Sequence, residues 1–162
     1  MRYRFIDRVL AVDAHGAGTI RTSKAFARSE EYLEGTFRRA GEVPASLVLE
    51  AMAAAASLLL AVRSRYRTHG VLLKVARAEF APPPSAGERL TIEAAIRAVQ
   101  DARDASEPGM AEITATCRTE ERTVGSAELL FLCVPMAWSF GPEADRVVSE
   151  LLELIGLADA RP

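Results

Sequence analysis

The sequence predicts an α+β fold in which an antiparallel sheet wraps around one long central helix. Residues 44–67 have the apolar spacing of a helix, whereas the runs before and after them have the composition of strands. The helical stretch is apolar around most of its circumference, which is typical of a helix enclosed by other structure. Strands that are segregated from the helix in this way favour an α+β architecture over an alternating α/β one.

Two strands are expected before the helix. Residues 3–12 combine β-branched and apolar residues with interleaved charges, and residues 19–26 have the same character. The turn sequence between them, residues 15–18 (HGAG), predicts that the two strands form a hairpin.

The helix is predicted to begin at Pro44, because a proline in the first turn loses no helical hydrogen bond and its φ is already suitable. Apolar residues then recur every three or four positions to about Arg67, and we expect Gly70 to end the helix. The positions on its apolar faces are Leu47, Val48, Ala51, Met52, Ala54, Ala55, Leu58, Leu59, Ala61 and Val62.

Four strands and a second helix follow. The strands are predicted at residues 71–80, 90–99, 111–118 and 124–134, the last two joined as a hairpin by the charged turn TEERT. Residues 135–142 are interpreted as a linker, and residues 143–157 as an amphipathic helix. We therefore expect a domain at residues 1–134 and a C-terminal extension at residues 135–162. The extension's helix is expected to pack on its own domain or on a dimer mate; binding of another partner is the alternative.

Composition argues against several classes of protein. The 162 residues are 49% hydrophobic and 26% charged with a net charge of −2, so the basic excess of a general nucleic-acid binder is missing. Asp7 and Arg8 interrupt the N-terminal segment, unlike in a signal peptide. The longest apolar run, residues 51–62, is shorter than the roughly 20 residues that span a bilayer. These features predict a soluble, cytoplasmic protein with no nucleic-acid or membrane partner.

Cysteine and histidine residues are few and scattered. Cys117 and Cys133 are far apart in sequence and are interpreted as buried free thiols. His15 and His69 both lie in glycine-flanked polar segments, and no metal-ligand spacing is visible. We expect neither a metal nor a cofactor.

Four segments make the chain resemble a known enzyme family. They are FIDRVL (residues 5–10), GTFRRAGEVPASLVLEA (35–51), AEFAPPPSAGERL (78–90) and GSAELLF (125–131). In this order and at this spacing they resemble the β-hydroxyacyl-acyl-carrier-protein dehydratases of the FabZ/FabA type, over about residues 2–134. The resemblance implies the hotdog fold, a homodimer, and action on thioesters of acyl carrier protein or coenzyme A in fatty-acid, polyketide or aryl-polyene-type lipid synthesis.

The resemblance also implies site residues. In the family a loop histidine moves the C2 proton, a helix carboxylate from across the dimer interface assists the leaving oxygen, and a backbone N–H at the helix start holds the thioester carbonyl. Glu50 stands at the carboxylate position, Ala45 at the position of the helix-start glycine, and Thr36 where the family has its histidine. An unassisted hydroxyl is a poor base at neutral pH, so the catalytic pair is incomplete. Thr36 either hydrogen-bonds substrate or caps local backbone.

The remaining implied roles concern binding. Gly35, Phe37, Pro44 and Ala45 correspond to substrate-binding positions, and neither His15 nor His69 matches the position of the missing histidine. Cations around the helix and the following strand are expected to meet an acidic carrier, although cations are favourable at a helix C-terminus in any case. The predicted carrier-docking residues are Arg38, Arg39, Arg63, Arg67 and Lys74.

Three functions stay open from the sequence. The first is a dehydratase homologue that is weak alone or that serves as the partner subunit of a histidine-bearing homologue in a heterodimer. The second is a hotdog thioesterase in which Glu50 activates water and Thr36 positions it. The third is a non-catalytic acyl binder.

Overall fold

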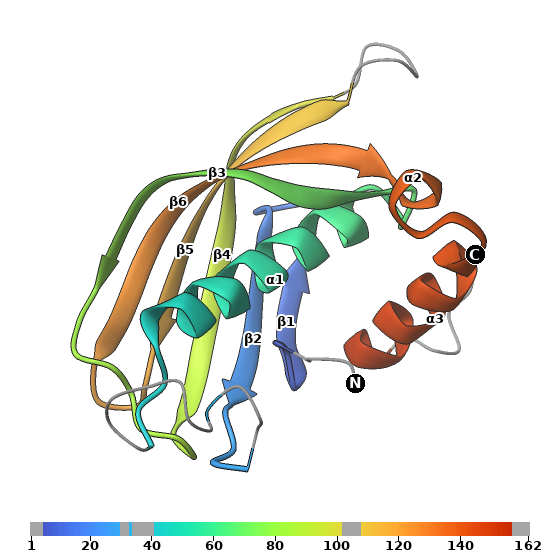
Figure 1. The fold of residues 1–162 in the computed structure, drawn as a ribbon. Coiled ribbons are helices and arrows are strands. Elements are labelled where there is room, and N and C mark those ends of the chain that lie inside the picture. Colours follow the sequence, from blue (N-terminus) through green and yellow to red (C-terminus); the bar gives the residue numbers. More distant parts are fainter. Residues whose placement is uncertain (1–4, 30–32, 34–40, 102–107, 157–162) are drawn as a thin grey trace.

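The computed structural model describes residues 5–29, 33, 41–101 and 108–156. Within them an antiparallel six-stranded sheet, in the order β1-β2-β4-β5-β6-β3, curves around the long helix α1 (Figure 1). The elements are β1 (Arg8–Asp13), β2 (Thr19–Ala25), α1 (Ala45–Arg63), β3 (Thr68–Phe80), β4 (Arg89–Gln100), β5 (Gly109–Arg118), β6 (Thr123–Pro135), α2 (Met136–Phe140), the 3-10 turn η2 (Gly141–Glu143) and α3 (Ala144–Ile155). The α+β prediction, with one central helix and a C-terminal helix, is confirmed.

The core lies between α1 and the concave face of the sheet. Along α1, alanines such as Ala51 and Ala55 alternate with larger residues such as Met52 and Leu59, and all four are fully buried. Small side chains let the helix backbone approach the sheet closely, while the larger ones fill the remaining space. Among the described residues α1 is the helix long and apolar enough to cross a membrane, and its enclosure by the sheet accounts for that composition.

The end of α1 differs from the prediction. The helix stops at Arg63 rather than near Arg67, and the chain reverses through Arg65 and Tyr66, whose φ angles are 54° and 59°. Gly70 does not end the helix, because it lies inside β3. A Cβ atom there would sit 2.7 Å from Leu60 Cδ1 and 2.9 Å from Phe131 Cδ1. Glycine at this position therefore serves close packing of α1 on the sheet.

The first strand is shorter than predicted. β1 begins at Arg8 rather than at Tyr3, and residues 5–7 are held to β2 largely by the Asp7 side chain. The Asp7 carboxylate accepts hydrogen bonds from Lys24 Nζ at 3.1 Å and from the Ala25 N–H at 2.7 Å. Phe5 packs edge-on against Phe26, with ring centroids 6.4 Å apart. Together with the Asp7 N–H, which donates to the Ser23 carbonyl at 2.9 Å, these contacts hold the segment against the end of β2.

Strand β3 forms one edge of the sheet. Its neighbour is β6, and three consecutive apolar residues at its start, Val71, Leu72 and Leu73, are 40%, 36% and 53% exposed. A long edge strand with unpaired backbone groups and exposed apolar side chains is suited to pairing with another strand.

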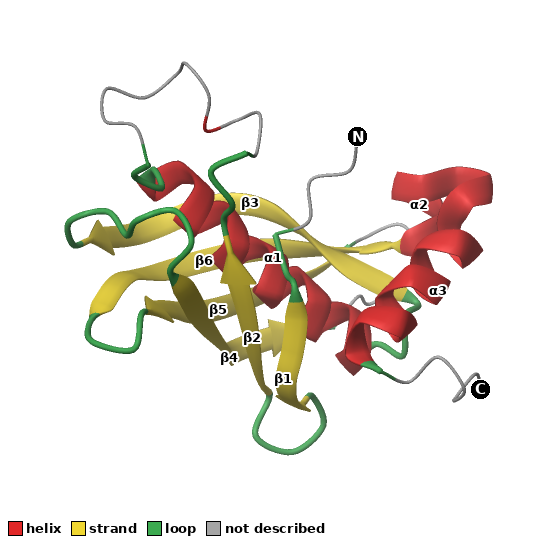
Figure 2. Ribbon diagram, turned by 90° about the horizontal axis from the view of Figure 1, so that it is seen from below, coloured by secondary structure: helices red, strands yellow, loops and turns green. Residues whose placement is uncertain are grey.

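The interpretation of residues 135–142 as a linker is wrong. Met136 starts the short helix α2; its side chain is buried, and its N–H donates to the Arg67 carbonyl at 3.0 Å. The helix α3 then packs on α2 and β1 of its own domain, as the simpler interpretation expected. Figure 2 shows α2 and α3 together at one end of α1.

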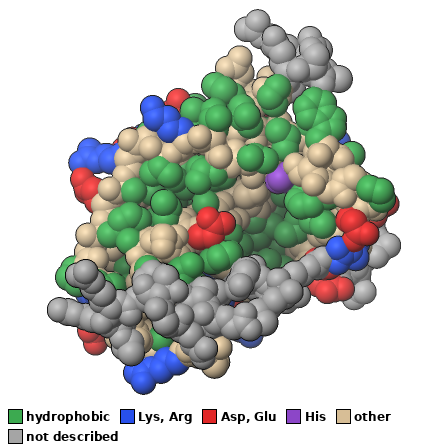
Figure 3. Space-filling view, in the orientation of Figure 1, with side chains coloured by type: hydrophobic (Ala, Val, Ile, Leu, Met, Phe, Trp, Pro, Cys, Tyr) green, Lys and Arg blue, Asp and Glu red, His purple; other side chains and the backbone are tan. Residues whose placement is uncertain are grey.

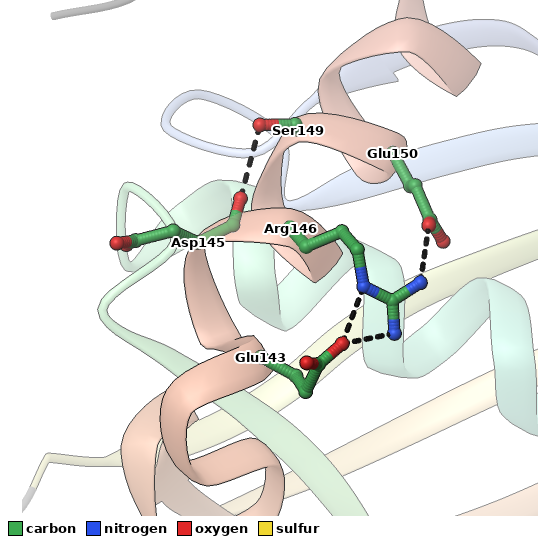
Figure 4. A network of polar contacts seen from close by, with 5 residues as sticks. All are labelled: Glu143, Asp145, Arg146, Ser149 and Glu150. Atoms are coloured by element: carbon green, nitrogen blue, oxygen red, sulfur yellow. Dashed lines mark hydrogen bonds and ion pairs between the residues drawn. The ribbon is translucent and has the colours of Figure 1, made fainter.

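Ion pairs on the surface hold the first turns of α3. Arg146 pairs with Glu143 and, at 3.1 Å, with Glu150 (Figure 4). Exposed pairs of this kind contribute about 0.3–0.5 kcal/mol each. They help to fix where α3 begins but are a minor part of its stability.

Candidate functional site

The start of α1 opens into an apolar cavity. Pro44 and Ala45, two of the predicted substrate-binding residues, line a cavity of about 340 Å³ together with Val48, Phe80 and Pro84. Pro44 is the N-cap and offers no side-chain hydrogen bond, and the first turn has no acidic residue. The N–H groups of a first helical turn have no carbonyl partner inside the helix. The Ala45 end of α1 can therefore donate to a carbonyl oxygen held in this cavity.

Glu50 lines a different and larger cavity. It is exposed, and it shares a space of about 670 Å³ with Ala54, Ser57, Leu58 and Ala61 of the same helix. We call this cavity the α1–α3 groove, because α3 supplies its opposite wall. The residues of that wall are Val147, Glu150, Leu151 and Leu154, and the other lining residues are Phe5, Ile6, His69, Met136 and Phe140. Figure 3 shows this side of the molecule, with hydrophobic side chains gathered around a hollow and acidic and histidine side chains among them.

One chain does not bring Ala45 and Glu50 to the same cavity. They are five residues apart on a helix that turns about 100° per residue, so their side chains point about 140° apart. The two cavities accordingly have no lining residue in common. Within the part of the chain that the structure describes, Ala45 and Glu50 thus line separate cavities.

His69 lies in the groove with Glu50, which the sequence did not indicate. The Ser57 hydroxyl donates to the carbonyl of Gly70 at 2.7 Å, and this contact places the start of β3 beside the second half of α1. Ser57 is seven residues from Glu50, or about 10 Å along the helix axis. The histidine and the carboxylate thus occupy separate parts of one groove and do not form a close pair.

The His69 ring is held by the C-terminal segment. Its Nε2 lies 2.8 Å from Ser139 Oγ, and its centroid lies 4.9 Å from that of Phe140. Burial lowers the pKa of His69, with partial compensation from a hydrogen bond to the Gly70 backbone. The ring is therefore neutral at pH 7 and engaged with Ser139. Neither spacing nor motif in the sequence signals this position, since the contact depends on the α1–β3 packing.

The predicted carrier-docking residues are distributed over the molecule. Arg63 and Arg67 line a cavity of about 510 Å³ with His15 and Asp101, at the C-terminal end of α1. Arg63 is 18 residues from Ala45, so it lies about 27 Å from the helix start. Lys74 is exposed on β3. Gly35, Thr36, Phe37, Arg38 and Arg39 lie outside the described residues.

The thiols are free, as expected, but only one is fully buried. Cys117 is buried in the sheet, and burial raises its pKa to about 12. Cys133 is half-buried and lines the same cavity as Arg63. Within the part of the chain that the structure describes, no three His, Cys, Asp or Glu side chains gather as metal ligands would.

Comparison with known proteins places these features in context. A family model described as a FabA-like domain matches residues 1–128, which end before α2 and α3 begin. The 3-hydroxyacyl-[acyl-carrier-protein] dehydratase FabZ of Protochlamydia amoebophila is 34% identical over 94 residues, which cover 57% of this chain and 60% of that enzyme. The aligned segment thus spans less than two thirds of that relative.

Solved structures show the same hotdog fold. A Streptococcus mutans protein bound to acetyl-CoA superimposes with a TM-score of 0.60 at 10% identity, covering 83% of this chain and 94% of that one. A hypothetical thioesterase from Streptococcus pneumoniae, solved with coenzyme A, gives 0.57 at 12% identity, covering 79% and 85%. The PaaI protein of E. coli gives 0.57 at 11% identity, covering 78% of each chain. At identities this low the comparison shows a shared fold and does not show a shared activity.

Proposed function

This chain belongs to the FabA-like domain family, and we propose that it is a FabZ-like homologue that binds 3-hydroxyacyl thioesters at a site shared by two chains. The observation that carries the proposal is the orientation of α1, which presents Ala45 to one cavity and Glu50 to another. In a shared site one chain supplies the helix-start N–H and its partner supplies the carboxyl group. The exposed β3 edge supports pairing of two such chains.

The reaction removes water from the 3-hydroxyacyl thioester. The Ala45 N–H polarises the thioester carbonyl, which acidifies the C2–H and stabilises the enolate-like charge that develops on the oxygen. The Glu50 carboxyl group gives a proton to the C3 hydroxyl as it leaves as water. The C2 proton goes to water in a dimer of this chain alone, and to the histidine of a histidine-bearing partner in a mixed dimer. General acid–base catalysis contributes about 10²–10⁴-fold, so a chain with Thr36 in place of the histidine is a weak dehydratase alone. It reaches full activity with a histidine-bearing partner subunit.

Complementation between variants of this chain tests the shared site. A Thr36→His/Glu50→Gln double variant carries a base but no carboxyl group, whereas the wild-type chain carries the carboxyl group but no base. Hydration of crotonyl-pantetheine should be weak for each protein alone and should rise at least about tenfold when the two are mixed, because mixed dimers contain one complete site. As the matched control, the double variant mixed with Glu50→Gln should stay inactive. Correctly folded mixtures without any gain would refute the shared site.

The carrier arm is proposed to approach over the cationic residues. A carrier protein is acidic and its pantetheine arm bears a phosphate, so Arg63 and Arg67, which line one cavity at the C-terminal end of α1, are suited to meet it. Charge reversal at Arg63 should slow turnover of acyl-carrier-protein substrates and make it less salt-dependent. Turnover of the uncharged pantetheine thioester should be unchanged, and equal slowing of both substrates would contradict docking at this position.

Thioester hydrolysis is the second candidate, because Glu50 is exposed in a groove that is open to solvent. A carboxylate that water can reach is able to activate it for attack on the thioester, with the Ala45 N–H as oxyanion donor. The test is whether the wild-type protein releases free pantetheine from acyl-pantetheine. Release that is abolished in the Glu50→Gln variant would establish this activity. Binding without hydration or hydrolysis, in wild type and mixtures alike, would identify a non-catalytic acyl binder.

A further inference from the structure

The helix α3 has two apolar stripes, and both contribute to packing, since Leu151 and Leu154 of the second stripe are partly buried against the core. Leu152 is buried, and Ile155 packs against the core beside it. The neighbouring stripe, Val147, Leu151 and Leu154, recurs at the spacing of one helix face and lines the α1–α3 groove. A stripe of apolar side chains along a cavity is unfavourable in water unless an apolar ligand covers it.

The groove has the dimensions of a small-molecule site. Helices that pack directly on each other have axes about 8–10 Å apart. Between α1 and α3 there is instead a cavity of about 670 Å³, within the range of about 300–1,000 Å³ that is usual for ligand pockets. Its floor on α1 runs from Glu50 to Ala61, which is about 16 Å along the helix axis. A flexible chain of atoms fits this length and volume.

The charges in the groove select against anionic ligands. Among the described residues that line it there is no Lys or Arg, and Glu150 is paired with Arg146, so a free fatty acid or a phosphate would find no counter-charge. At the part nearest Ala61, His69 is hydrogen-bonded to Ser139 and packs against Phe140, so its polar atom is already satisfied. The groove therefore suits an uncharged apolar chain.

We propose that α3 forms the wall of an acyl-chain groove and that Val147, Leu151 and Leu154 set the length of acyl chain that the protein accepts. The inference rests on the proposed function, because it places the acyl chain of the same thioester along α1. It assigns a binding role to the C-terminal extension, which lies beyond the residues that the family model matches. The occupant is the uncharged tail of an acyl thioester.

Acyl-pantetheine thioesters of increasing length, from butanoyl to tetradecanoyl, provide the test. Titration calorimetry on the wild-type protein should show affinity rising about fourfold for each methylene that enters the groove and then levelling off. Val147→Phe and Leu154→Phe fill the groove, so each should weaken decanoyl-pantetheine binding by about tenfold or more and change butanoyl-pantetheine binding less than about twofold.

The chain offers a matched control in the adjacent valine. Val148 is half-buried like Val147 but does not line the groove, so Val148→Phe should leave the length dependence as in the wild type. Leu151→Ala enlarges the groove and should move the plateau towards longer chains, which keeps the test informative if a phenylalanine variant unfolds. Melting temperatures identify any such variant.

The outcomes separate this inference from the proposed function. If no thioester of any length binds to the wild type, the proposed function fails. If thioesters bind but folded Val147→Phe and Leu154→Phe proteins keep the wild-type length dependence, the groove inference alone is overturned. A change in oligomeric state in those variants without a change in length dependence would mean that a second copy of the chain covers the groove, and it would overturn the inference too.

Discussion

Substituting Gly70 by alanine tests how tightly α1 packs on the sheet. The added Cβ would lie 2.7 Å from Leu60 Cδ1 and 2.9 Å from Phe131 Cδ1, and both side chains are almost fully buried. Overpacking of this kind costs about 1–3 kcal/mol. Gly70 does not have a positive φ, so alanine can adopt its backbone conformation. Alanine also lowers the conformational entropy of the unfolded chain, and this offsets about 0.4–1 kcal/mol of the packing cost. We expect a net loss of about 1–2 kcal/mol, equivalent to a melting temperature lower by about 2–8 °C.

A double-mutant cycle identifies the cause of this loss. Leu60→Ala alone should cost about 2–5 kcal/mol because it leaves a cavity. In the double variant the alanine at position 70 occupies part of that space, so the two losses should fall short of additivity by about 0.5–2 kcal/mol in urea unfolding. Strict additivity, or an unchanged stability of Gly70→Ala, would refute the reasoning that glycine is needed here for close approach.

Three further predictions concern other parts of the domain. Thr22 is 0% exposed, and its hydroxyl has no hydrogen-bond partner among the described residues. Thr22→Val should therefore raise the free energy of unfolding, measured by urea titration, by about 1 kcal/mol. A lower free energy of unfolding would mean that the hydroxyl has a partner. Hydrogen bonds from the N–H groups of Ala17 and Gly16 lower the pKa of the Asp13 carboxyl group in the folded protein. The ionised carboxylate therefore stabilises the fold at pH values above the unfolded pKa, and this stabilisation is lost as the pH falls through the folded pKa. Asp13→Ala should therefore be less stable than wild type at pH 7, and the difference should shrink towards pH 2; a constant difference would contradict this. Burial raises the pKa of Cys117 to about 12, so iodoacetamide at pH 8 should modify this thiol only after the protein unfolds. Peptide mass spectrometry measures the modification, and rapid labelling of the folded protein would contradict the burial.

The sequence was sufficient for the main architecture, because α1 and the strands have strong patterns. A helix that is apolar on nearly all sides has to be enclosed by other structure. The turn between β5 and β6 is formed by consecutive charged residues, and the Thr119 N–H donates to the Arg122 carbonyl across it. The position of Glu50 on α1 also followed from the resemblance, and the structure places it in a groove.

The features that were missed depend on contacts between distant segments. Gly70 has the local character of a helix stop, but its role comes from Leu60 and Phe131, which approach it from α1 and β6. His69 enters the groove because β3 packs on the second half of α1, which no local pattern reveals. Met136 starts a helix where a linker was predicted, because its side chain is buried and its N–H bonds to the turn after α1.

The position of α3 after the last strand affects how the domain can diversify. The sheet and α1 form the folding core, and α3 is attached to them after the last strand has been completed. On the proposed acyl-chain groove, exchange of the segment that follows β6, by recombination or by design, would alter ligand preference and leave the sheet and α1 in place. Chimaeras that carry this segment from different homologues would then differ in the acyl chains that they bind, provided that the new segment keeps the buried contacts of Met136 and Leu152.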